Sequence, residues 1–351
     1  MPSMNVAMFY GPGDVRFERT EIPRPGPGEV LVKVHAALTC GTDIKTYKRG
    51  HPAMIKKVPC AFGHEFSGSV VERGAGVDSF RVGTRVVCCN AVPCQQCFYC
   101  KNDQQNLCED LLVLNGAYAE YIAIPRRMVE LNLLEVPEHL SDGEAALAEP
   151  LGTAVHAMRL TAVSPGDTVV VIGTGPLGLM IDRLAHLQGA KVIMMGKGTE
   201  RLRKAAEFGA NHVVDIAQCA SIDEQVERAR ELTDGKRGAD VVIEAVGQPE
   251  AWVEALRMVR KGGKVTFFGG CKTGTSITVD TAQLHYSELR LLGTFHQRPD
   301  DFRRSLHLLS SRSVDGRQFI KETVPLSKLL DAFERVKSLE GIKFAIDPAV
   351  M

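Results

Sequence analysis

The chain has 351 residues, of which 44% are hydrophobic and 24% are charged, so it is long enough for about two globular domains. Its 42 Lys and Arg residues balance 42 Asp and Glu residues, and this neutrality offers no overall attraction to nucleic acid or anionic lipid. No apolar run approaches the ~18 residues that span a bilayer, and the start of the chain lacks the form of a signal peptide. We therefore expect a cytoplasmic protein with no nucleic-acid partner and no membrane partner.

The N-terminal part of the chain is predicted to be rich in β-strands. Residues 29–36 alternate between apolar side chains and polar or charged ones, as in a strand with one buried face. Shorter strand candidates follow at 69–72 and 84–89, and glycine and proline separate them. This part of the chain shows no regular alternation of strands with long helices.

From residue 168 the pattern changes to strands that alternate with helices. The strand candidates lie at 168–172, 191–195, 212–216, 239–246, 263–269 and 289–295. Amphipathic stretches long enough for crossover helices lie between them at 201–208, 223–233 and 250–259. The last residues of the chain hold another expected helix, at 327–337, with Phe333 in its apolar stripe. Such alternation predicts an α/β fold whose doubly wound parallel sheet is covered by helices on both faces.

A glycine-rich turn directly follows the first of these strands. Residues 173–178 read Gly-Thr-Gly-Pro-Leu-Gly, and an apolar stretch with helical spacing comes next. In this context the three glycines suit a tight turn, close approach to a pyrophosphate and close packing of helix on strand. We expect the phosphates of a dinucleotide at Gly173, Gly175, Pro176, Leu177 and Gly178. A glycine turn without a ligand is the alternative.

The end of the next strand bears on which nicotinamide cofactor binds. NAD-binding sites usually place Asp or Glu there to hold the ribose 2′-hydroxyl. This chain has Gly196 and Lys197 instead, with Arg201 one turn further on. Glycine leaves room for a 2′-phosphate, and the two cations can pair with it. We therefore expect NADP(H) in preference to NAD(H), with the alternative that both cations are solvated surface groups.

Four of the ten cysteines are clustered in one polar loop, with the spacing C-x2-C-x2-C-x7-C. Four thiolates at this spacing can complete a tetrahedral zinc site and leave no position open for a substrate. The loop has few apolar residues of its own, so a bound metal would provide the order that a core cannot. The sequence therefore predicts a structural zinc held by Cys94, Cys97, Cys100 and Cys108.

Further candidate ligands lie far apart along the chain. Cys40 stands in Thr-Cys-Gly-Thr-Asp, His64 and Glu65 in Gly-His-Glu, and Glu149 in Glu-Pro-Leu-Gly. Spacing alone does not show that they meet. With the four-cysteine loop, the glycine turn and Leu-Gly-Thr-Phe at 292–295, these motifs make the chain resemble the zinc-dependent medium-chain dehydrogenases/reductases, the alcohol dehydrogenase superfamily. The resemblance covers essentially the whole chain and is strongest for the sorbitol (polyol) and threonine dehydrogenase branch.

The resemblance implies a domain arrangement and an assembly. It places a GroES-like, β-rich catalytic domain at 1–152 and 295–351, and a Rossmann nucleotide-binding domain at 153–294. Members of the superfamily are typically dimers or tetramers, so a homodimer or homotetramer is implied.

The resemblance also implies a catalytic zinc, which makes two zinc ions per chain. Cys40, His64 and Glu65 match its ligands. Glu149 matches the acidic residue that contacts the zinc-bound water or at times the metal itself. Thr42 matches the hydroxyl group that relays the proton of the substrate. A cysteine thiolate, a carboxylate and a neutral imidazole balance the charge of Zn²⁺.

The activity implied is hydride transfer between the nicotinamide cofactor and a small secondary alcohol or ketone. We expect a polyol, cyclitol or sugar alcohol as substrate; a threonine-type amino alcohol or a non-catalytic member of the superfamily is the alternative. Polyol dehydrogenases usually carry arginine where this chain has His296. His296, Tyr47 and Tyr118 are the candidates for the substrate pocket, with plain packing as the alternative for the tyrosines.

Overall fold

The computed structural model describes residues 2–52 and 54–351, and the chain divides into two compact units. The first comprises Met1–Gly152 and Gln297–Met351, and the second comprises Thr153–His296. The second boundary therefore lies at 296/297, where 294/295 was expected. In the described residues we find no helix whose length and apolar character suit a membrane span.

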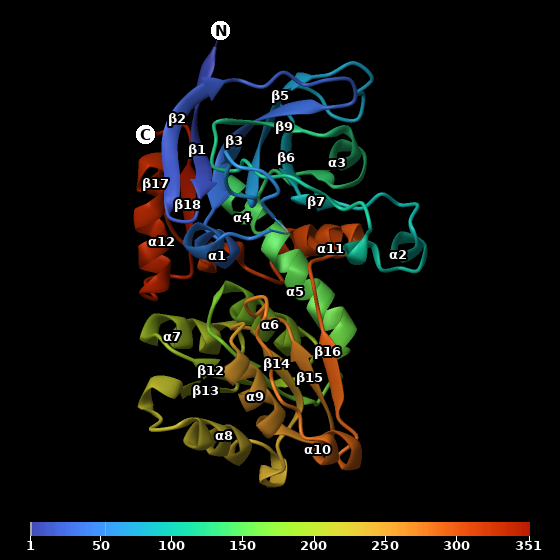
Figure 1. Cartoon of the computed structure of the whole chain (residues 1–351), viewed down its shortest axis with the longest axis vertical. Helices are drawn as coiled ribbons and strands as arrows, with labels where there is room; N and C mark the ends of the chain where they lie inside the picture. Colours follow the sequence, from blue (N-terminus) through green and yellow to red (C-terminus); the bar gives the residue numbers. More distant parts are fainter. Residues whose placement is uncertain (1, 53) are drawn as a thin grey trace. The chain divides into compact units, whose positions relative to one another are not determined.

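The first unit consists mainly of β-strands (Figure 1). Its strands are β1 (Ser3–Gly11), β2 (Asp14–Glu21), β3 (Val30–Leu38), β4 (Cys60–Ala61), β5 (Phe66–Arg73), β6 (Arg85–Cys88), β7 (Ala91–Val92), β8 (Leu112–Val113), β9 (Tyr121–Ile124), β10 (Leu133–Glu135), β17 (Ile320–Pro325) and β18 (Lys343–Asp347). Its helices are α1 (Gly41–Arg49), α2 (Phe98–Lys101), α3 (Arg126–Leu131), α4 (Asp142–Ala146), α11 (Pro299–Ser310) and α12 (Leu329–Lys337). A further helix, α5 (Ala148–Thr161), begins in this unit and ends in the second.

The main sheet of this unit is organised around β3. Its strand order is β10-β6-β5-β3-β18-β17, and β9 also pairs with β3. The β17–β18 pair is parallel, and the other pairs are antiparallel. The burial of β3 follows the predicted alternation, because Val30, Val32, Val34 and Ala36 are buried, whereas Lys33 is exposed and His35 is half-buried. The pairing of β18 with β3 brings the end of the chain against its beginning.

An aromatic cluster fills the core beside this sheet. The rings of Phe62, Tyr118 and Phe333 lie edge-on to one another with centroids 5.8–6.3 Å apart, and Phe9 stacks on Phe62 at 5.3 Å. Edge-on contacts are a favoured geometry for aromatic pairs, because the positive ring edge meets a negative face. Phe333 belongs to the apolar stripe predicted for the helix at 327–337, and α12 buries this stripe here.

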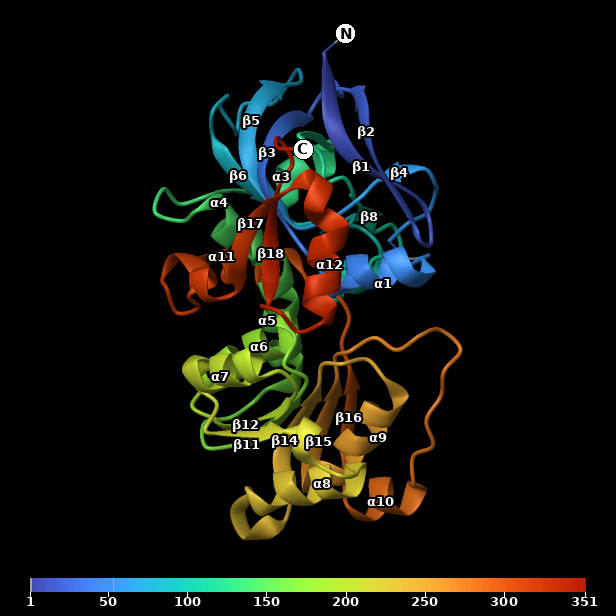
Figure 2. The same cartoon turned by 90° about the vertical axis from the view of Figure 1, so that its left-hand side faces the viewer.

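The second unit is a doubly wound parallel sheet. Its strands are β11 (Thr168–Ile172), β12 (Lys191–Gly196), β13 (His212–Asp215), β14 (Ala239–Glu244), β15 (Val259–Phe267) and β16 (Arg290–Gly293). Its helices are α6 (Pro176–Leu187), α7 (Thr199–Phe208), α8 (Ile222–Glu231), α9 (Pro249–Met258) and α10 (Thr281–Tyr286). The order β13-β12-β11-β14-β15-β16 is that of dinucleotide-binding folds, and it confirms the α/β class. α6 and α7 lie together on one face, and α8 and α9 lie on the other (Figure 2).

The glycine turn connects β11 to α6, as expected. Gly173 has a φ of +115°, a region that favours glycine, and a Cβ there would lie 2.9 Å from Val246. A Cβ on Gly178 would lie 1.9 Å from the carbonyl oxygen of Gly173. Only glycine therefore permits α6 to start so close to the end of β11, where its free N–H groups suit an anion.

The sequence analysis missed seven helices, of which α2, α3, α4 and α10 are short and α1, α5 and α11 are longer. α1 is strongly polar, and its N-terminus is capped by the sulfur of Cys40, which is not a usual capping residue. α11 begins with Pro299, and one face of this helix is buried. α11 also contacts α4. Tertiary contacts, more than local periodicity, decide these segments.

A buried acidic side chain in α6 makes the stability of the protein depend on pH. The carboxylate of Asp182 is fully buried, and neither oxygen has a hydrogen-bond partner. Burial raises the pKa of Asp182 to about 8, and the nearby Arg183 only partly opposes this. An unfolded Asp has a pKa of about 3.9, so the folded state holds the proton more tightly. Stability contributed by this proton is complete below about pH 4 and is lost as the pH rises through about 8.

We predict that Asp182→Asn removes this contribution to the pH dependence, because the amide does not ionise. The stability of the variant relative to the wild type should increase between about pH 5 and about pH 8, by up to about 1.4 kcal/mol per pH unit. Thermal unfolding of both proteins across this range measures the difference. A difference that stays constant with pH contradicts the prediction.

Candidate functional site

Cys40, His64 and Glu65 come together in the first unit, with one potential ligand atom from each within 4.8 Å of the others. Cys40 follows β3 and caps α1, where its sulfur accepts a hydrogen bond from the Thr42 N–H at 3.3 Å. His64 and Glu65 directly precede β5, which pairs with β3, and the Leu38 N–H donates to the Glu65 carbonyl at 3.0 Å. Strand pairing therefore brings together residues that lie far apart in the sequence.

The imidazole of His64 is held by a buried carboxylate. Its Nδ1 lies 2.8 Å from Oδ1 of Asp43, and the other oxygen of Asp43 accepts from the Tyr118 hydroxyl at 2.7 Å. An Nδ1–H that donates to Asp43 leaves Nε2 as the unprotonated ring nitrogen that can bind a metal. The chain of Tyr118, Asp43 and His64 thus selects one tautomer and one ring orientation.

Glu65 is held by a buried lysine from the last strand. Lys343 donates to Oε2 of Glu65 at 2.5 Å and to the carbonyl of Thr39 at 2.7 Å. Burial by itself lowers the pKa of Lys343, but the charges of Glu65 and Cys40 outweigh it and the pKa is raised. Oε1 of Glu65 is buried and has no hydrogen-bond partner. A buried carboxylate oxygen in this position, beside a sulfur and an imidazole, fits a bound zinc ion.

Glu149 lies beside this group and outside it. It is buried on α5, and its side chain accepts a hydrogen bond from Gln297 at 3.2 Å. Burial raises the pKa of Glu149 to about 7; the charge of His64 lowers it and that of Glu65 raises it. The pKa of the Glu149 carboxylate therefore depends on the charges of His64 and Glu65. The group of potential ligands found here in the described residues consists of Cys40, His64 and Glu65 and does not include Glu149.

The remaining expected residues of the substrate pocket lie in different environments. Tyr118 has no exposed surface, and its hydroxyl donates to Asp43 and to the carbonyl of Leu38. The expectation that Tyr118 lines a pocket is therefore wrong in this structure, because its ring packs in the aromatic core and its hydroxyl donates to Asp43, the partner of His64. Tyr47 is half-buried against Phe333, and Thr42 is half-buried in the first turn of α1. His296 belongs to the second unit, where its φ of +58° is unusual for a residue other than glycine.

The four clustered cysteines also converge. Their sulfurs all lie within 4.8 Å of one another in the loop that contains α2. Backbone N–H groups point at the sulfurs, for example that of Cys94 at Cys108 Sγ and that of Cys97 at Cys94 Sγ. Such donors favour thiolates, and those of Cys100 and Glu109 contribute most to lowering the pKa of Cys97 to about 6. The arrangement fits a closed tetrahedral zinc site in a loop whose Phe98 is 66% exposed.

The candidate site for the ribose phosphate is built on two linked turns. The Thr174 hydroxyl donates to the carbonyl of Lys197 at 2.8 Å, and a Cβ on Gly196 would lie 2.4 Å from the Thr174 side chain. Lys197 is exposed, whereas Arg201 is only 5% exposed, and burial lowers its pKa. Arg201 is therefore not a solvated surface cation. For Lys197, which is exposed, both interpretations stay open: a solvated surface group or a partner of the 2′-phosphate.

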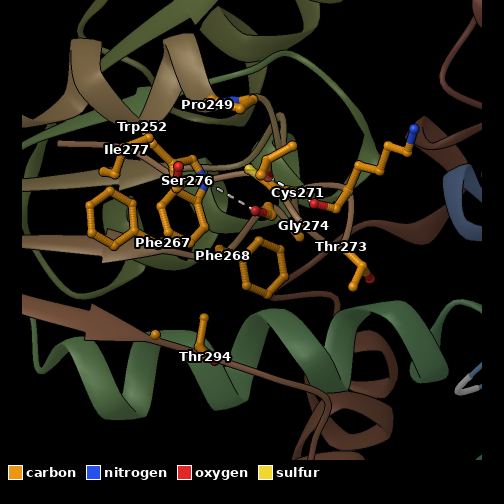
Figure 3. A pocket seen from close by; sticks show the side chains of 15 residues that line it. Pro249, Trp252, Phe267, Phe268, Cys271, Thr273, Gly274, Ser276, Ile277 and Thr294 are labelled. Carbon is orange, nitrogen blue, oxygen red and sulfur yellow. Dashed lines mark hydrogen bonds between the residues drawn. The ribbon is translucent and has the colours of Figure 1, made fainter.

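A cavity of about 350 Å³ lies in the second unit, beyond the carboxyl ends of β15 and β16 (Figure 3). Trp252 and Phe267 stack on one side of it with ring centroids 4.2 Å apart, and the indole N–H donates to the carbonyl of Gly269 at 3.1 Å. Phe268 and Thr294 also line the cavity. The sequence analysis missed this cavity; the Gly-Gly pair that follows β15 was the available signal. Ligands of doubly wound sheets bind beyond the carboxyl ends of the strands.

Comparisons with known proteins agree with this geometry. Residues 26–137 match the alcohol dehydrogenase GroES-like domain, and residues 176–311 match the zinc-binding dehydrogenase domain. The chain is 33% identical to a sorbitol dehydrogenase from Halalkalibacterium halodurans, over 97% of each protein. It is also 33% identical to a D-arabitol-phosphate dehydrogenase from Enterococcus avium, over 96% of this chain and 95% of that protein.

The fold of the chain is also similar to that of a solved structure. A protein from Sinorhizobium meliloti 1021, solved with bound NADP, superposes with a TM-score of 0.90 at 29% identity. The match covers 99% of this chain and 100% of that one. Sequence and structure thus both relate the chain to zinc-binding dehydrogenases.

The pair of Lys343 and Glu65 generates a prediction on stability. Lys343→Met removes the cation and leaves Glu65 buried beside Cys40, so we expect a loss of about 3–5 kcal/mol in the free energy of unfolding. Lys337→Met is the control, because the ion pair of Lys337 with Glu334 is solvent-exposed and should contribute little. Urea unfolding of the three proteins provides the measurement. If both variants are equally stable, the buried pair does not have this role.

Proposed function

Because the chain belongs to the family of zinc-dependent medium-chain dehydrogenases/reductases, we propose that it transfers a hydride between NADP(H) and a polyol, cyclitol or sugar alcohol, or the matching ketone. The observation that carries this proposal is the convergence of Cys40, His64 and Glu65 at one point. These three residues would hold a zinc ion, and the ion would remain open to an oxygen of water or substrate. The chain is an oxidoreductase with a GroES-like domain and a Rossmann domain.

The residues around the site have distinct tasks in this reaction. Zinc bound to the three ligands supplies Lewis acidity, which favours loss of the alcohol proton or polarises a carbonyl group. Thr42 sits one residue from Asp43 and two from Cys40, and its hydroxyl is proposed to pass the alcohol proton towards solvent. Asp43 and Lys343 keep His64 and Glu65 in place. Glu149 contributes a carboxylate at the edge of the site.

The order of strands supports a direction for the bound cofactor. The pyrophosphate is proposed at the glycine turn after β11, and the adenosine half at the turn after β12. Since β14, β15 and β16 lie on the other side of β11, the nicotinamide half extends toward the cavity beside Trp252. The buried Arg201 and the exposed Lys197 supply positive charge for a 2′-phosphate. The bound NADP in the Sinorhizobium meliloti protein favours the same choice.

The substrate class rests on the relatives. Two of them are named as dehydrogenases of sorbitol and of an arabitol phosphate, both sugar alcohols. Threonine-type amino alcohols are the second candidate class from the sequence. We also propose two zinc ions per chain, one at each cysteine-containing cluster, a cytoplasmic location and a homodimer or homotetramer. Metal analysis and the native mass of the purified protein test the zinc and assembly proposals.

The first experiment tests the reaction itself. We expect turnover of at least one polyol or cyclitol in a panel that also contains threonine and other amino alcohols, each with NADP⁺ and NAD⁺. Cys40→Ala should abolish turnover, because it removes a zinc ligand from the site, while NADPH still binds. Trp252 is the single tryptophan and lines the cavity, so its fluorescence reports cofactor binding. Cys60→Ala, outside both cysteine clusters, should retain activity.

The outcomes separate the candidate functions. Oxidation of threonine alone selects the amino-alcohol alternative. A zinc-loaded protein that binds NADPH and turns over nothing in the panel contradicts the polyol proposal. Loss of NADPH binding in Cys40→Ala would mean that this variant is misfolded, and Cys40→Ser then replaces it.

The second experiment tests the cofactor preference. Lys197→Ala should lower the ratio of kcat/KM for NADP⁺ to that for NAD⁺ by about 10-fold or more, because one charge-assisted contact to the 2′-phosphate is lost. Adding Arg201→Ala should lower the ratio further. Lys191→Ala is the control, since Lys191 lies at the opposite end of β12. An unchanged ratio in the double variant contradicts the assignment of both residues.

A further inference from the structure

Gln297 is a buried residue of the first unit that the reaction proposed above does not use. Its side chain is 4% exposed and lies against Glu149, 148 residues earlier in the chain. Nε2 of Gln297 donates to the backbone carbonyl of Glu149 at 2.9 Å and to the carboxylate oxygen Oε1 at 3.2 Å. One amide group therefore contacts both ends of the same residue.

From this contact we infer that Gln297 is a positioning residue, whose side-chain amide holds the Glu149 carboxylate in place beside the metal ligands. The inference rests on the proposed function, because it assigns Glu149 to that site. Gln297 itself need not touch the substrate or the metal. It would act through the orientation of one carboxylate.

Electrostatics explain why Glu149 needs such a partner. Charged groups act on the Glu149 carboxylate in opposite directions, because His64 attracts it and the like charge of Glu65 repels it. A glutamate side chain has three rotatable bonds, so it can turn away from this repulsion. An N–H donor favours the ionised carboxylate and fixes its direction, because a hydrogen bond to a charged group is stronger than a neutral one.

The space for Gln297 depends on a glycine in α5. A Cβ on Gly152 would lie 1.7 Å from Oε1 of Gln297 and 2.8 Å from its Cδ. Gly152 is three residues after Glu149, so both residues face the same side of the helix. Packing therefore requires glycine at this position of the Glu-Pro-Leu-Gly motif, because any side chain there would displace the amide of Gln297.

The backbone next to Gln297 is anchored as well. Arg298 is buried, its N–H donates to Asp301 at 3.1 Å, and its guanidinium pairs with Asp301 and with Asp103. Asp103 belongs to the loop of the four clustered cysteines. Pro299 then begins α11. This anchoring leaves the side chain of Gln297 little freedom to follow Glu149 if the carboxylate turns, so the contact restrains the carboxylate.

The test compares Gln297→Leu with Gln318→Leu. Leucine has a similar size and lacks the amide. Gln318 is the control, because it is another glutamine of the first unit whose side chain hydrogen-bonds a carboxylate, that of Asp315, although Gln318 is half-buried where Gln297 is buried. We expect Gln297→Leu to lower kcat by about 10- to 100-fold and leave the KM for NADP⁺ unchanged. Gln318→Leu should match the wild type in both constants.

A second readout is independent of turnover. Zinc release to a chelator should show two phases, and Cys40→Ala identifies the phase that belongs to the Cys40 cluster. We expect Gln297→Leu to accelerate that phase by about 10-fold, because the loss of an outer partner weakens metal binding. The phase of the four-cysteine cluster should not change.

Gly152→Ala tests the same contact without removing the amide. The added methyl group must displace Gln297, so this variant should reproduce both effects of Gln297→Leu, although alanine is the better helix former. In a Glu149→Gln background, Gln297→Leu should add little, because the carboxylate that it would position is absent. Gly152→Ala keeps the inference testable if Gln297→Leu fails to fold.

The results distinguish this inference from the proposed function. If the wild type is inactive but Gln297→Leu accelerates zinc release, the function fails and the positioning role stands. If the wild type is active and Gln297→Leu behaves like Gln318→Leu in both readouts, the positioning role is wrong. Equal losses in the Glu149 and Glu149→Gln backgrounds also overturn it.

Discussion

The candidate metal site depends on one buried ion pair, between Lys343 in the last strand and Glu65 before β5. Both side chains are almost completely removed from solvent, and an isolated charge in such a place would cost several kcal/mol. Lys343 comes from β18, which pairs with β3 next to Cys40. The carboxylate of Glu65 is therefore balanced only after the C-terminal strand has joined the sheet. Both segments of the first unit thus contribute to the candidate site.

The same principle recurs around the site, because His64 and Glu149 also have buried hydrogen-bond partners. Asp43 orients His64 and is itself held by Tyr118, while Gln297 contacts Glu149. Networks of this kind tend to restrict a site to one arrangement, since every alternative leaves a buried polar atom unsatisfied. The chemistry of the ligands is thus prepared by residues that need not contact the substrate.

The second unit uses backbone geometry more than charge. Glycines at the first turn allow α6 to start against β11, and its N–H groups are free for a phosphate. Selectivity for the second phosphate, in contrast, is proposed to depend on two side chains with different surroundings. Arg201 is buried, whereas Lys197 is exposed. Each unit therefore carries one part of the reaction, and each is explained by its own contacts.

Local sequence patterns predicted those parts of the candidate sites whose residues all lie within one short stretch of the chain. The four clustered cysteines and the glycine turn each occupy one stretch of chain, so their spacing alone indicates their chemistry. The alternation of strands and helices predicted the α/β class and, within a few residues, the strands of the parallel sheet. The grouping of Cys40, His64 and Glu65 needed a family resemblance, because nothing in their spacing shows that β3 pairs with β5.

The sequence by itself determined the fold class, the cofactor turn and the four-cysteine loop, since each depends on neighbours along the chain. Only the tertiary structure decided that Tyr118 is a core residue beneath Asp43, that Lys343 balances Glu65 and that Gln297 contacts Glu149. These contacts join residues from 75 to 278 positions apart. A lysine or a glutamine has no periodicity that would predict its partner, and burial in one particular core is what turns an ordinary polar residue into part of a site.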